Sequence, residues 1–413
     1  MARSRQPNNT RQRRRRRASP SASVRLVEVT IDEIGTRGDG IATVDGNQIY
    51  IPCTAPGDVV KVELRGQRGQ ISELISQSPH RVPPPCPHFG SCGGCSLQHL
   101  DAGYYSGWKR GLVINALVRA GFDEGLIAPL VACEPSSRRR AEFSVFKNKA
   151  GLTFGFNARR SDRISEIESC SVLHPKLSSR LNDLKIFSSA VPAHSFDLGV
   201  MLCNNGLDIN IVCEKLDELS AAEISALANQ MRAVSCIRLS LNGETEIELE
   251  KPITRLGAVE VSPPPGAFLQ ASQEAENVLA ALVLKSLGQA KRVADLFSGS
   301  GTFTFRIAEG AAVDAYDADR PAIAALDVAA RGASLPHPVK AIVQNLFDRP
   351  VMAAELDLYD AIVFDPPRGG SKAQADEIAL SQVPKVISVS CNPVSFARDA
   401  AILRAGGSTP CRR

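Results

Sequence analysis

The chain reads AIVFDPPRGG at residues 361–370 and KVISVSCNP at residues 385–393, two apolar runs that each stop at a polar residue and a proline. Buried strands of a parallel sheet end in this way at the edge of an α/β domain, where ligands bind. We therefore expect Asp365 and Cys391 to lie side by side at that edge. A cysteine in a polar turn at a strand end is placed to act as a nucleophile. The alternative is a small buried cysteine that only fills space.

The composition of the chain excludes several classes of protein. Of its 413 residues, 44% are hydrophobic and 22% are charged, which is enough for a large core and more than one domain. No apolar run is long enough to span a bilayer, and residues 1–23 lack the apolar segment of a signal peptide, so we expect a cytoplasmic protein without membrane contact. Eleven cysteines in such a chain indicate metal binding or catalysis rather than a disulfide framework.

Positive charge is concentrated at the start of the chain. Residues 1–22 carry eight arginines and almost no apolar side chains, which is typical of a disordered tail. The formal net charge is +4, so the rest of the chain has a charge of −4. Three roles are compatible with the tail: contact with RNA phosphates, a solvated solubilising segment, or a transit peptide.

Short alternating runs predict two domains before residue 266. In residues 23–80 these runs are separated by Gly, Asp and Asn turns, as in the small closed β-barrels that often bind single-stranded nucleic acid. Residues 81–265 begin with a proline-rich linker and continue with alternating strands interrupted by helices near 175–187 and 220–232, which predicts an α+β middle domain. Three cysteines in these apolar strands are expected in the core: Cys203, Cys213 and Cys236.

A glycine-rich loop, CPHFGSCGGC at residues 86–95, holds three cysteines. Because glycine lets the backbone fold tightly, Cys86, Cys92 and Cys95 can converge on one centre. That centre is either a zinc knuckle or an iron–sulfur cluster, which as a rule needs four thiolates. The candidates for the fourth ligand are His88 or His99 for zinc, and Cys133 or Cys170 for the cluster.

From residue 266 the pattern changes to strand–helix alternation, which predicts a parallel sheet. The run 292–297 is followed by SGSGTF at residues 298–303, a glycine-rich turn that would let a ligand approach backbone N–H groups. The next predicted strand, residues 312–317, ends in Asp317. An acid about twenty residues past such glycines is placed to bind a ribose.

These stretches resemble the RNA uracil-5-methyltransferases, specifically the iron–sulfur-containing subgroup with an N-terminal TRAM domain. The resemblance covers residues 23–405. It rests on FLQ at 268–270, DLFSGSG at 295–301, FDPPRG at 364–369, SCNP at 390–393 and the three-cysteine loop. It implies a TRAM-like, OB-like barrel at 23–80, the α+β middle domain at 81–265, and a Rossmann-like methyltransferase domain at 266–413 that is incomplete at its C-terminus.

The resemblance also implies roles for individual residues. Cys391 would add to carbon 6 of a uracil, so that carbon 5 can accept a methyl group from S-adenosylmethionine. The segment 155–170 resembles the one that carries the family's fourth ligand, which implies a 4Fe–4S cluster. Its ligands would be Cys86, Cys92, Cys95 and Cys170. The residues that would contact the cofactor or the target base are Gln270, Phe297, Thr302, Asp317, Asn345 and Asp365.

The implied partner is an RNA substrate, and ribosomal RNA fits the cluster and the barrel better than transfer RNA by analogy with the family. The target base must leave its stack to reach the pocket. Arg368 would orient the uracil or the backbone. Arg138–Arg140 would grip the RNA unless they form a solvated loop. We expect a monomer.

The end of the chain departs from the family. The family carries a downstream Glu that removes the carbon 5 proton, whereas the only acid in residues 392–413 is Asp399. The family's sheet also has two more strands there, so the resemblance implies a truncated or frame-shifted chain with residues 386–389 as an exposed edge. Two alternatives to an active enzyme follow: a catalytically impaired remnant that acts at most as an RNA-binding protein, and a zinc-binding nucleic-acid module with an unrelated methylase domain.

Overall fold

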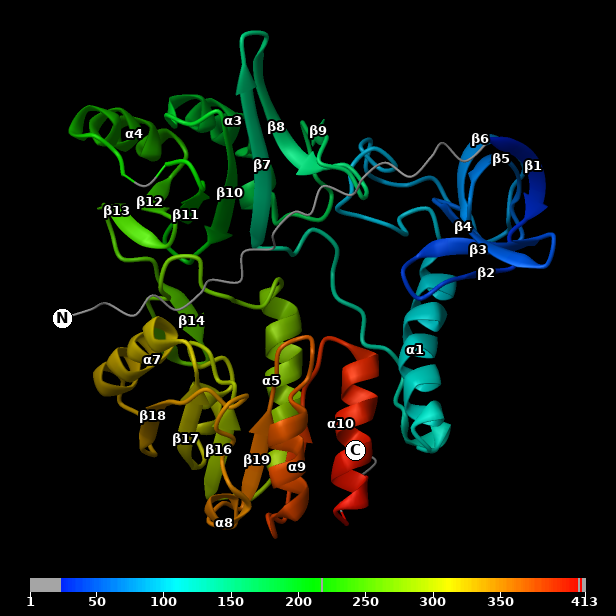
Figure 1. Ribbon diagram of the computed structural model, residues 1–413. Coiled ribbons are helices and arrows are strands. Elements are labelled where there is room, and N and C mark those ends of the chain that lie inside the picture. The colour runs from blue at the N-terminus through cyan, green and yellow to red at the C-terminus, as the bar shows by residue number, and fades with distance from the viewer. Residues whose placement is uncertain (1–23, 217, 408, 411–413) are drawn as a thin grey trace. The chain divides into compact units, whose positions relative to one another are not determined.

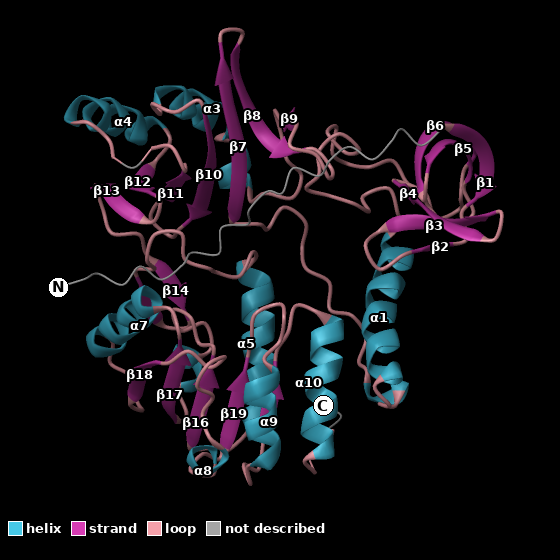
Figure 2. Cartoon of the chain, viewed as in Figure 1, coloured by secondary structure: helices cyan, strands magenta, loops and turns pink. Residues whose placement is uncertain are grey.

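The computed structural model describes residues 24–216, 218–407 and 409–410. The chain divides into two compact units, and the boundary in the sequence falls between Val82 and Pro83. The predicted tail at residues 1–22 lies outside the described residues. Figure 1 labels the elements of both units, and Figure 2 distinguishes helices from strands. No helix of the described ranges combines the length and the apolar character that crossing a membrane requires.

The first unit is a six-stranded sheet in the order β1–β5–β6–β4–β3–β2. Its strands are β1 (Arg25–Thr30), β2 (Glu33–Ile34), β3 (Asp39–Val44), β4 (Asn47–Pro52), β5 (Val59–Arg65) and β6 (Arg68–Ser76). Between β3 and β4, Asp45 and Gly46 both have positive φ, as the preferred two-residue hairpin turn requires. Inward side chains form one apolar core: Val29, Ile31, Ala42, Ile49, Ile51, Val60 and Val62. The predicted small β-domain is confirmed.

The second unit contains a seven-stranded sheet in the order β13–β12–β11–β10–β7–β8–β9. Its strands are β7 (Arg140–Asn148), β8 (Gly151–Asn157), β9 (Ile164–Glu166), β10 (Ser195–Leu202), β11 (Leu207–Val212), β12 (Cys236–Leu241) and β13 (Glu244–Glu248). Neighbours are antiparallel except β11 and β12, which run parallel and are joined by α4 (Ala221–Ala233). The predicted α+β fold is therefore present.

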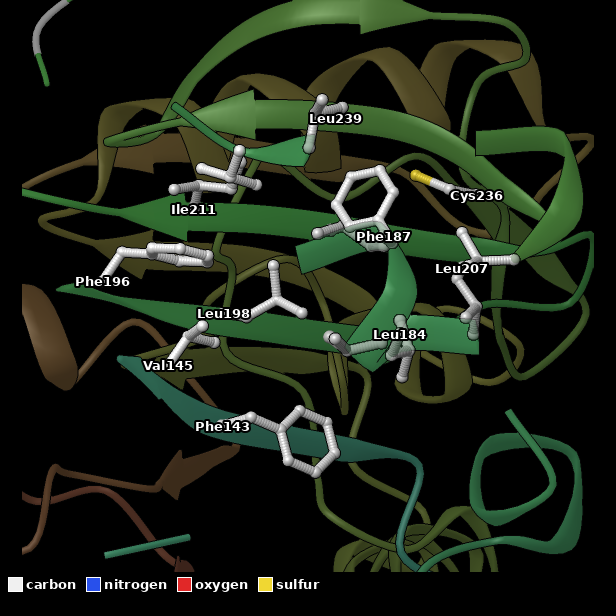
Figure 3. Close-up of a cluster of buried hydrophobic side chains, with 14 of the residues drawn as sticks. Phe143, Val145, Leu184, Phe187, Phe196, Leu198, Leu207, Ile211, Cys236 and Leu239 are labelled. Atoms are coloured by element: carbon white, nitrogen blue, oxygen red, sulfur yellow. The ribbon is translucent and has the colours of Figure 1, made fainter. Parts of the chain in front are cut away.

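Helices cover one face of this sheet. The helix predicted at 175–187 is interrupted at Arg180, giving α2 (Pro175–Ser178) and α3 (Leu181–Ala190). Leu184 and Phe187 of α3 belong to the same buried cluster as Phe143 and Leu198 of the sheet (Figure 3). The three cysteines expected in the core, Cys203, Cys213 and Cys236, are all buried.

The last part of the second unit is a five-stranded parallel sheet in the order β18–β17–β16–β19–β20. Its strands are β16 (Arg292–Leu296), β17 (Ala312–Asp317), β18 (Val339–Val343), β19 (Ala361–Phe364) and β20 (Val386–Ser388). The connecting helices are α6 (Thr304–Ile307), α7 (Arg320–Gly332), α8 (Ala353–Leu356) and α9 (Lys372–Leu380), with α5 (Gln273–Leu287) before and α10 (Pro393–Ala405) after the sheet. This strand order confirms the predicted Rossmann-like fold.

Side chains of this sheet alternate between two apolar cores, as the two-residue period of a strand requires. Val293, Val313 and Val363 pack with α5 and α6 on one face. Leu296 and Phe364 belong to a second cluster with residues of α8, α9 and α10. Burial on both faces explains why apolar residues predominate in these strands, most clearly in β19.

Smaller elements connect the main parts of the second unit. They are α1 (Ala102–Arg119), a 3-10 turn (Glu124–Leu126), and the hairpin β14 (Thr254–Leu256) and β15 (Val259–Val261). The C-terminal end of α1 is tied to α10, because the Arg404 guanidinium donates to the carbonyls of Ala120 and Gly121 and lies over the Phe122 ring. These bonds satisfy carbonyls that the end of α1 leaves without helical partners.

Candidate functional site

All five strands are parallel, but the direction in which the chain adds them reverses between β16 and β19, which are neighbours in the sheet and not in the sequence. In sheets of this order, ligands bind beyond the carboxyl ends of the strands at that point. Phe297 follows β16, Asp317 ends β17, Asp365 follows β19 and Cys391 follows β20. Four of the predicted site residues therefore belong to one edge of the sheet.

The glycine-rich turn after β16 is held in an unusual conformation. Phe297 has a φ of 66°, a region that bulky side chains rarely adopt and that is found mainly at functional sites. The N–H groups of Phe297 and Ser298 both donate to the Tyr316 carbonyl, at 2.9 and 3.0 Å. Gly301 has a φ of 99°, and a Cβ there would press against the Phe305 ring. The turn thus requires glycine and lies close to the sheet.

Three buried polar atoms beside this turn have no hydrogen-bond partner among the described residues: Asp295 Oδ1, Ser298 Oγ and Ser300 Oγ. The other oxygen of Asp295 accepts from the Thr304 hydroxyl at 2.6 Å. Burial, together with the charges of Asp365 and Asp317, raises the pKa of Asp295 to about 7. Sequence reasoning gave Asp295 no role, although an acid inside an apolar strand was a visible signal. Unpaired buried polar groups fit a pocket that is completed by a polar ligand.

The predicted cofactor residues differ in how many hydrogen bonds their side chains already make within the protein. The two oxygens of Asp317 accept from the N–H groups of Gly299 and Asp319, both at 2.9 Å, which leaves lone pairs for hydroxyls. Asn345 is exposed after β18, where its side chain accepts from Phe347 N–H and donates to Asp348. Its amide is thus engaged within its own turn.

The aromatic and backbone contacts of the other predicted residues are also defined. The Phe297 ring packs against the rings of Phe347 and Phe364, with centroids 5.4 and 5.9 Å apart. Gln270 and Thr302 are half-buried, and their carbonyls accept from Arg139 and Arg306 respectively. Both lie on loops that precede helices, α5 and α6.

The turn between β20 and α10, which carries Cys391 and is called the cysteine turn below, is held against the loop after β19 by hydrogen bonds. Val389 N–H donates to the Phe364 carbonyl at 2.9 Å, which continues the pairing of β19 with β20 up to the turn. The side chains of Asn392 and Ser395 both donate to the Arg368 carbonyl, at 3.0 and 2.9 Å. Cys391 itself is exposed. The turn therefore presents a thiol at the sheet edge next to the loop that begins with Asp365.

Two acids near this turn have different environments. Burial raises the pKa of Asp365 to about 6. Asp399 of α10 is 3% exposed, accepts from Ser371 N–H at 3.1 Å and pairs with Arg398 at 2.6 Å. Arg398 also donates to the Gly369 carbonyl at 3.0 Å. Asp399 is thus engaged in holding the loop after β19 and is poorly placed to act as a base.

The predicted cluster ligands line one cavity of about 260 Å³. All four thiols, those of Cys86, Cys92, Cys95 and Cys170, contribute to its wall, whereas Cys133 is not part of it. A backbone hydrogen bond joins the 86–95 loop to the end of β8, because Gly93 N–H donates to the Asn157 carbonyl at 3.0 Å. Among the described residues no group of three or more Cys, His, Asp or Glu side chains forms a site for a single metal ion. A multi-iron cluster is larger than a single ion, so its thiolate ligands stand farther from one another than the ligands of one ion.

The two histidines considered as zinc ligands have other contacts. His88 lines the thiol cavity, but its Nε2 accepts from Glu168 N–H at 3.2 Å. The fully buried His99 ring packs against Phe89, with centroids 5.3 Å apart, and is not part of the cavity wall. This arrangement favours a fourth thiolate over a histidine.

The segment Arg138–Arg140 is only partly the solvated loop considered from the sequence, because Arg138 is exposed while Arg139 is buried and Arg140 begins β7. Arg139 is 5% exposed and takes part in a buried ion-pair network. Arg138 and Arg140 line the thiol cavity, and the Arg140 guanidinium lies 4.2 Å from the centre of the Phe268 ring. Sequence reasoning missed this arrangement because the partners of Arg139 lie more than a hundred residues away.

Comparison with known proteins relates both units to described families. A TRAM domain model matches residues 21–66. An uncharacterized RNA methyltransferase from Brucella suis is 46% identical over 383 residues, which cover 92% of this chain and 91% of that protein. Another, from Rhizobium meliloti, is 42% identical over 388 residues and 92% of each chain. A 23S rRNA (uracil(1939)-C(5))-methyltransferase from a Shewanella species is 28% identical over 421 residues, covering 94% of this chain and 92% of that one.

A solved structure has a similar fold. The tRNA (uracil-54, C5)-methyltransferase of Pyrococcus abyssi, in complex with S-adenosyl-L-homocysteine, aligns with a TM-score of 0.70 and 23% identity over 91% of this chain and 92% of that one. At this identity the likeness concerns the fold. The fold of this chain is therefore one that a solved protein also adopts.

Proposed function

Because the chain belongs to the family of RNA methyltransferases, we propose that it transfers a methyl group from S-adenosylmethionine to carbon 5 of a uridine in RNA, through a covalent bond to Cys391. The observation that carries this proposal is the cysteine turn. An exposed thiol follows β20 and Asp365 follows the neighbouring strand β19, at the carboxyl ends of the sheet that also carries the glycine-rich turn.

The chemistry assigns a separate task to each group. Carbon 5 of uracil is a poor nucleophile, and addition of the Cys391 thiolate to carbon 6 makes carbon 5 nucleophilic. S-adenosylmethionine supplies an electrophilic methyl group when bound. After transfer, the carbon 5 proton would pass to solvent water, the sulfur–carbon bond would break, and its electron pair would return to the thiolate. Asp365, beside the cysteine turn, would hold the uracil edge by hydrogen bonds.

The polar groups beside the glycine-rich turn are suited to a binding pocket for the proposed cofactor. Asp317 would accept from ribose hydroxyls, and Phe297 and Thr302 would line the pocket. The unpaired oxygens of Asp295 and Ser298 give it additional polar groups. Gln270 and Asn345 would contact the cofactor or the base, with Asn345 needing to exchange its present bonds.

For the four-cysteine cavity we propose a 4Fe–4S cluster with a structural role. Cys86, Cys92, Cys95 and Cys170 would be its ligands, and thiolates are the usual ligands of such clusters. Anaerobically purified protein should then be brown and contain iron and sulfide, and Cys170→Ser should lose both. Cys133→Ser is the matched control and should keep them. Colourless protein with one equivalent of zinc would contradict the proposal.

As substrate we propose ribosomal RNA. The support is the Shewanella relative, which is named for 23S rRNA, whereas the Pyrococcus protein, named for tRNA, is less similar in sequence. The TRAM match at residues 21–66 supports an RNA ligand. Ribosomal and transfer RNA transcripts offered in equal amounts would separate the two substrates.

The proposed function is tested with labelled S-adenosylmethionine and these transcripts. Wild type should transfer label to carbon 5 of uridine, and Cys391→Ser should transfer none. A denaturing gel should show an RNA adduct that depends on Cys391. Cys133→Ser, which removes another exposed cysteine, should behave as wild type. Methyl transfer by Cys391→Ser would refute the covalent mechanism. RNA binding without any transfer by wild type would favour the alternative of an RNA-binding protein.

A further inference from the structure

A buried triad of charged side chains lies outside the predicted site. Glu276 of α5 is fully buried, and its two oxygens pair with two arginines. Arg139, just before β7, donates to Oε2 at 2.5 Å, and Arg306 of α6 donates to Oε1 at 2.9 Å. The arginines are 5% and 8% exposed. The triad thus joins three segments that are distant in sequence.

Each arginine of the triad also bonds a backbone carbonyl at a predicted pocket residue. Arg139 Nε donates to the Gln270 carbonyl at 2.9 Å, and Arg306 Nη1 donates to the Thr302 carbonyl at 2.6 Å. The backbone N–H of Arg139 donates in addition to the Ala271 carbonyl at 2.8 Å. A guanidinium can bond a carboxylate and a carbonyl at the same time because its fork of donors has a fixed geometry. One carboxylate therefore fixes the position of two loops.

The energetics of burial argue that stability alone does not account for this triad. Removing three charges from water has a large cost, and buried ion networks are often no more stabilising than apolar side chains of equal volume. Their best-attested contribution is to fix geometry. Here the fixed geometry is that of the backbone on which Gln270 and Thr302 stand.

A second buried pair in the same unit serves as a comparison. Arg238 of β12 donates to both oxygens of Asp208 at 2.9 and 2.6 Å, and to the Pro263 carbonyl at 2.8 Å. Its side chain is 5% exposed. Like Arg139, Arg238 donates to a buried carboxylate and to one backbone carbonyl, but that carbonyl does not belong to a predicted cofactor residue.

We propose that Arg139, Glu276 and Arg306 are positioning residues that set the distance between the two cofactor-binding loops, 268–272 and 298–304. This inference rests on the proposed function for its ligand, S-adenosylmethionine. Arg139 acts through Gln270, and Arg306 acts through Thr302. Neither arginine touches the ligand itself.

The test replaces arginine by lysine at three positions. A lysine keeps the charge and can still pair with the carboxylate, but it has no planar fork and cannot hold the carbonyl in the same geometry. Calorimetry with S-adenosylmethionine should give a Kd raised about tenfold in Arg139→Lys and in Arg306→Lys, the effect of one lost bond to a charged donor. Arg238→Lys, which makes the same chemical change elsewhere, should leave Kd within about twofold of wild type while lowering Tm similarly.

Amide hydrogen exchange of the ligand-free protein gives a second readout. Peptides covering 268–277 and 298–306 should exchange faster in Arg139→Lys and Arg306→Lys but not in Arg238→Lys. Unchanged Kd and exchange in the first two variants would overturn the inference, and so would an equal loss of affinity in Arg238→Lys. Wild type that fails to bind S-adenosylmethionine would refute the proposed function, and exchange would still decide whether the triad positions the loops.

Discussion

Replacing Asp295 with Asn should stabilise the protein at alkaline pH and leave its stability nearly unchanged below pH 3.8. Asp295 is fully buried, and burial, reinforced by the charges of Asp365 and Asp317, raises its pKa from 3.8 to about 7. Asn has nearly the same shape as the neutral carboxyl and cannot ionise. The variant therefore removes the cost of a buried charge and keeps the bond from the Thr304 hydroxyl.

The sign and size of the effect follow from proton binding. Between pH 3.8 and about 7 the folded chain keeps the proton that the unfolded chain has released, so the free energy of unfolding falls as pH rises through this range. Each pKa unit corresponds to about 1.4 kcal/mol, which gives about 4 kcal/mol for the whole range. Between pH 5 and pH 8, the difference in free energy of unfolding between Asp295→Asn and wild type should grow by roughly 2–3 kcal/mol.

The assay is urea unfolding at pH 5 and pH 8, followed by far-UV circular dichroism and by fluorescence of the single tryptophan, Trp108. Asp360→Asn is the control with the opposite sign. The N–H groups of Lys291 and Arg292 donate to Asp360 and lower its pKa below 3.8, so this exposed variant should be less stable than wild type by the same amount at pH 5 and at pH 8, and should approach wild type only when the pH falls below 3.8. Asp295→Asn with wild-type stability at both pH values, or with lower stability at pH 8, would refute the reasoning.

Two further substitutions test the turns around the pocket. Asp317→Ala should weaken binding of S-adenosylmethionine by about 1.5–3 kcal/mol in calorimetry, the contribution of hydrogen bonds to a charged group, and unchanged affinity would argue against the ribose role. Gly370→Ala should lower the free energy of unfolding by at least about 1 kcal/mol, because φ is 68° and a Cβ would meet the Asp399 carboxylate and the Arg398 guanidinium. Gly369→Ala, where a Cβ meets no atom within 4 Å, is its control, and an equal loss in both would contradict the steric argument.

Much of the fold could be predicted because its signals are local. The run 361–364 is apolar throughout, and 292–297 is apolar except for Arg292 and Asp295, because both faces of the parallel sheet are covered. The runs 361–364 and 386–389 each end in a polar turn, which is sufficient to place Asp365 and Cys391 at one edge. The hairpin at Asp45 and Gly46 was similarly visible, since few other residues adopt its backbone angles.

The residues that sequence reasoning missed depend on partners far away in the chain. Arg139 stood in a run of three arginines that suggested an exposed basic segment, and only the tertiary structure brings Glu276 to it. The four thiols were expected together only through the family resemblance, because they lie on two segments whose meeting depends on the pairing of the 86–95 loop with the residues after β8. Neither arrangement leaves a periodic pattern in the sequence, because each is one contact between separate elements.

The electrostatics of the sheet edge favour a ligand with positive charge. The charges of Asp317 and Asp365 raise the pKa of Asp295, so that three carboxyl groups share one region of low solvent access. Protonation of one carboxyl group lowers the repulsion among the three. A nearby cation also lowers it, by stabilising the ionised carboxylates. The proposed cofactor carries a sulfonium and an ammonium group, whereas a nucleoside phosphate would add further negative charge. The arrangement of the acids is therefore compatible with the cationic methyl donor that the family relationship implies.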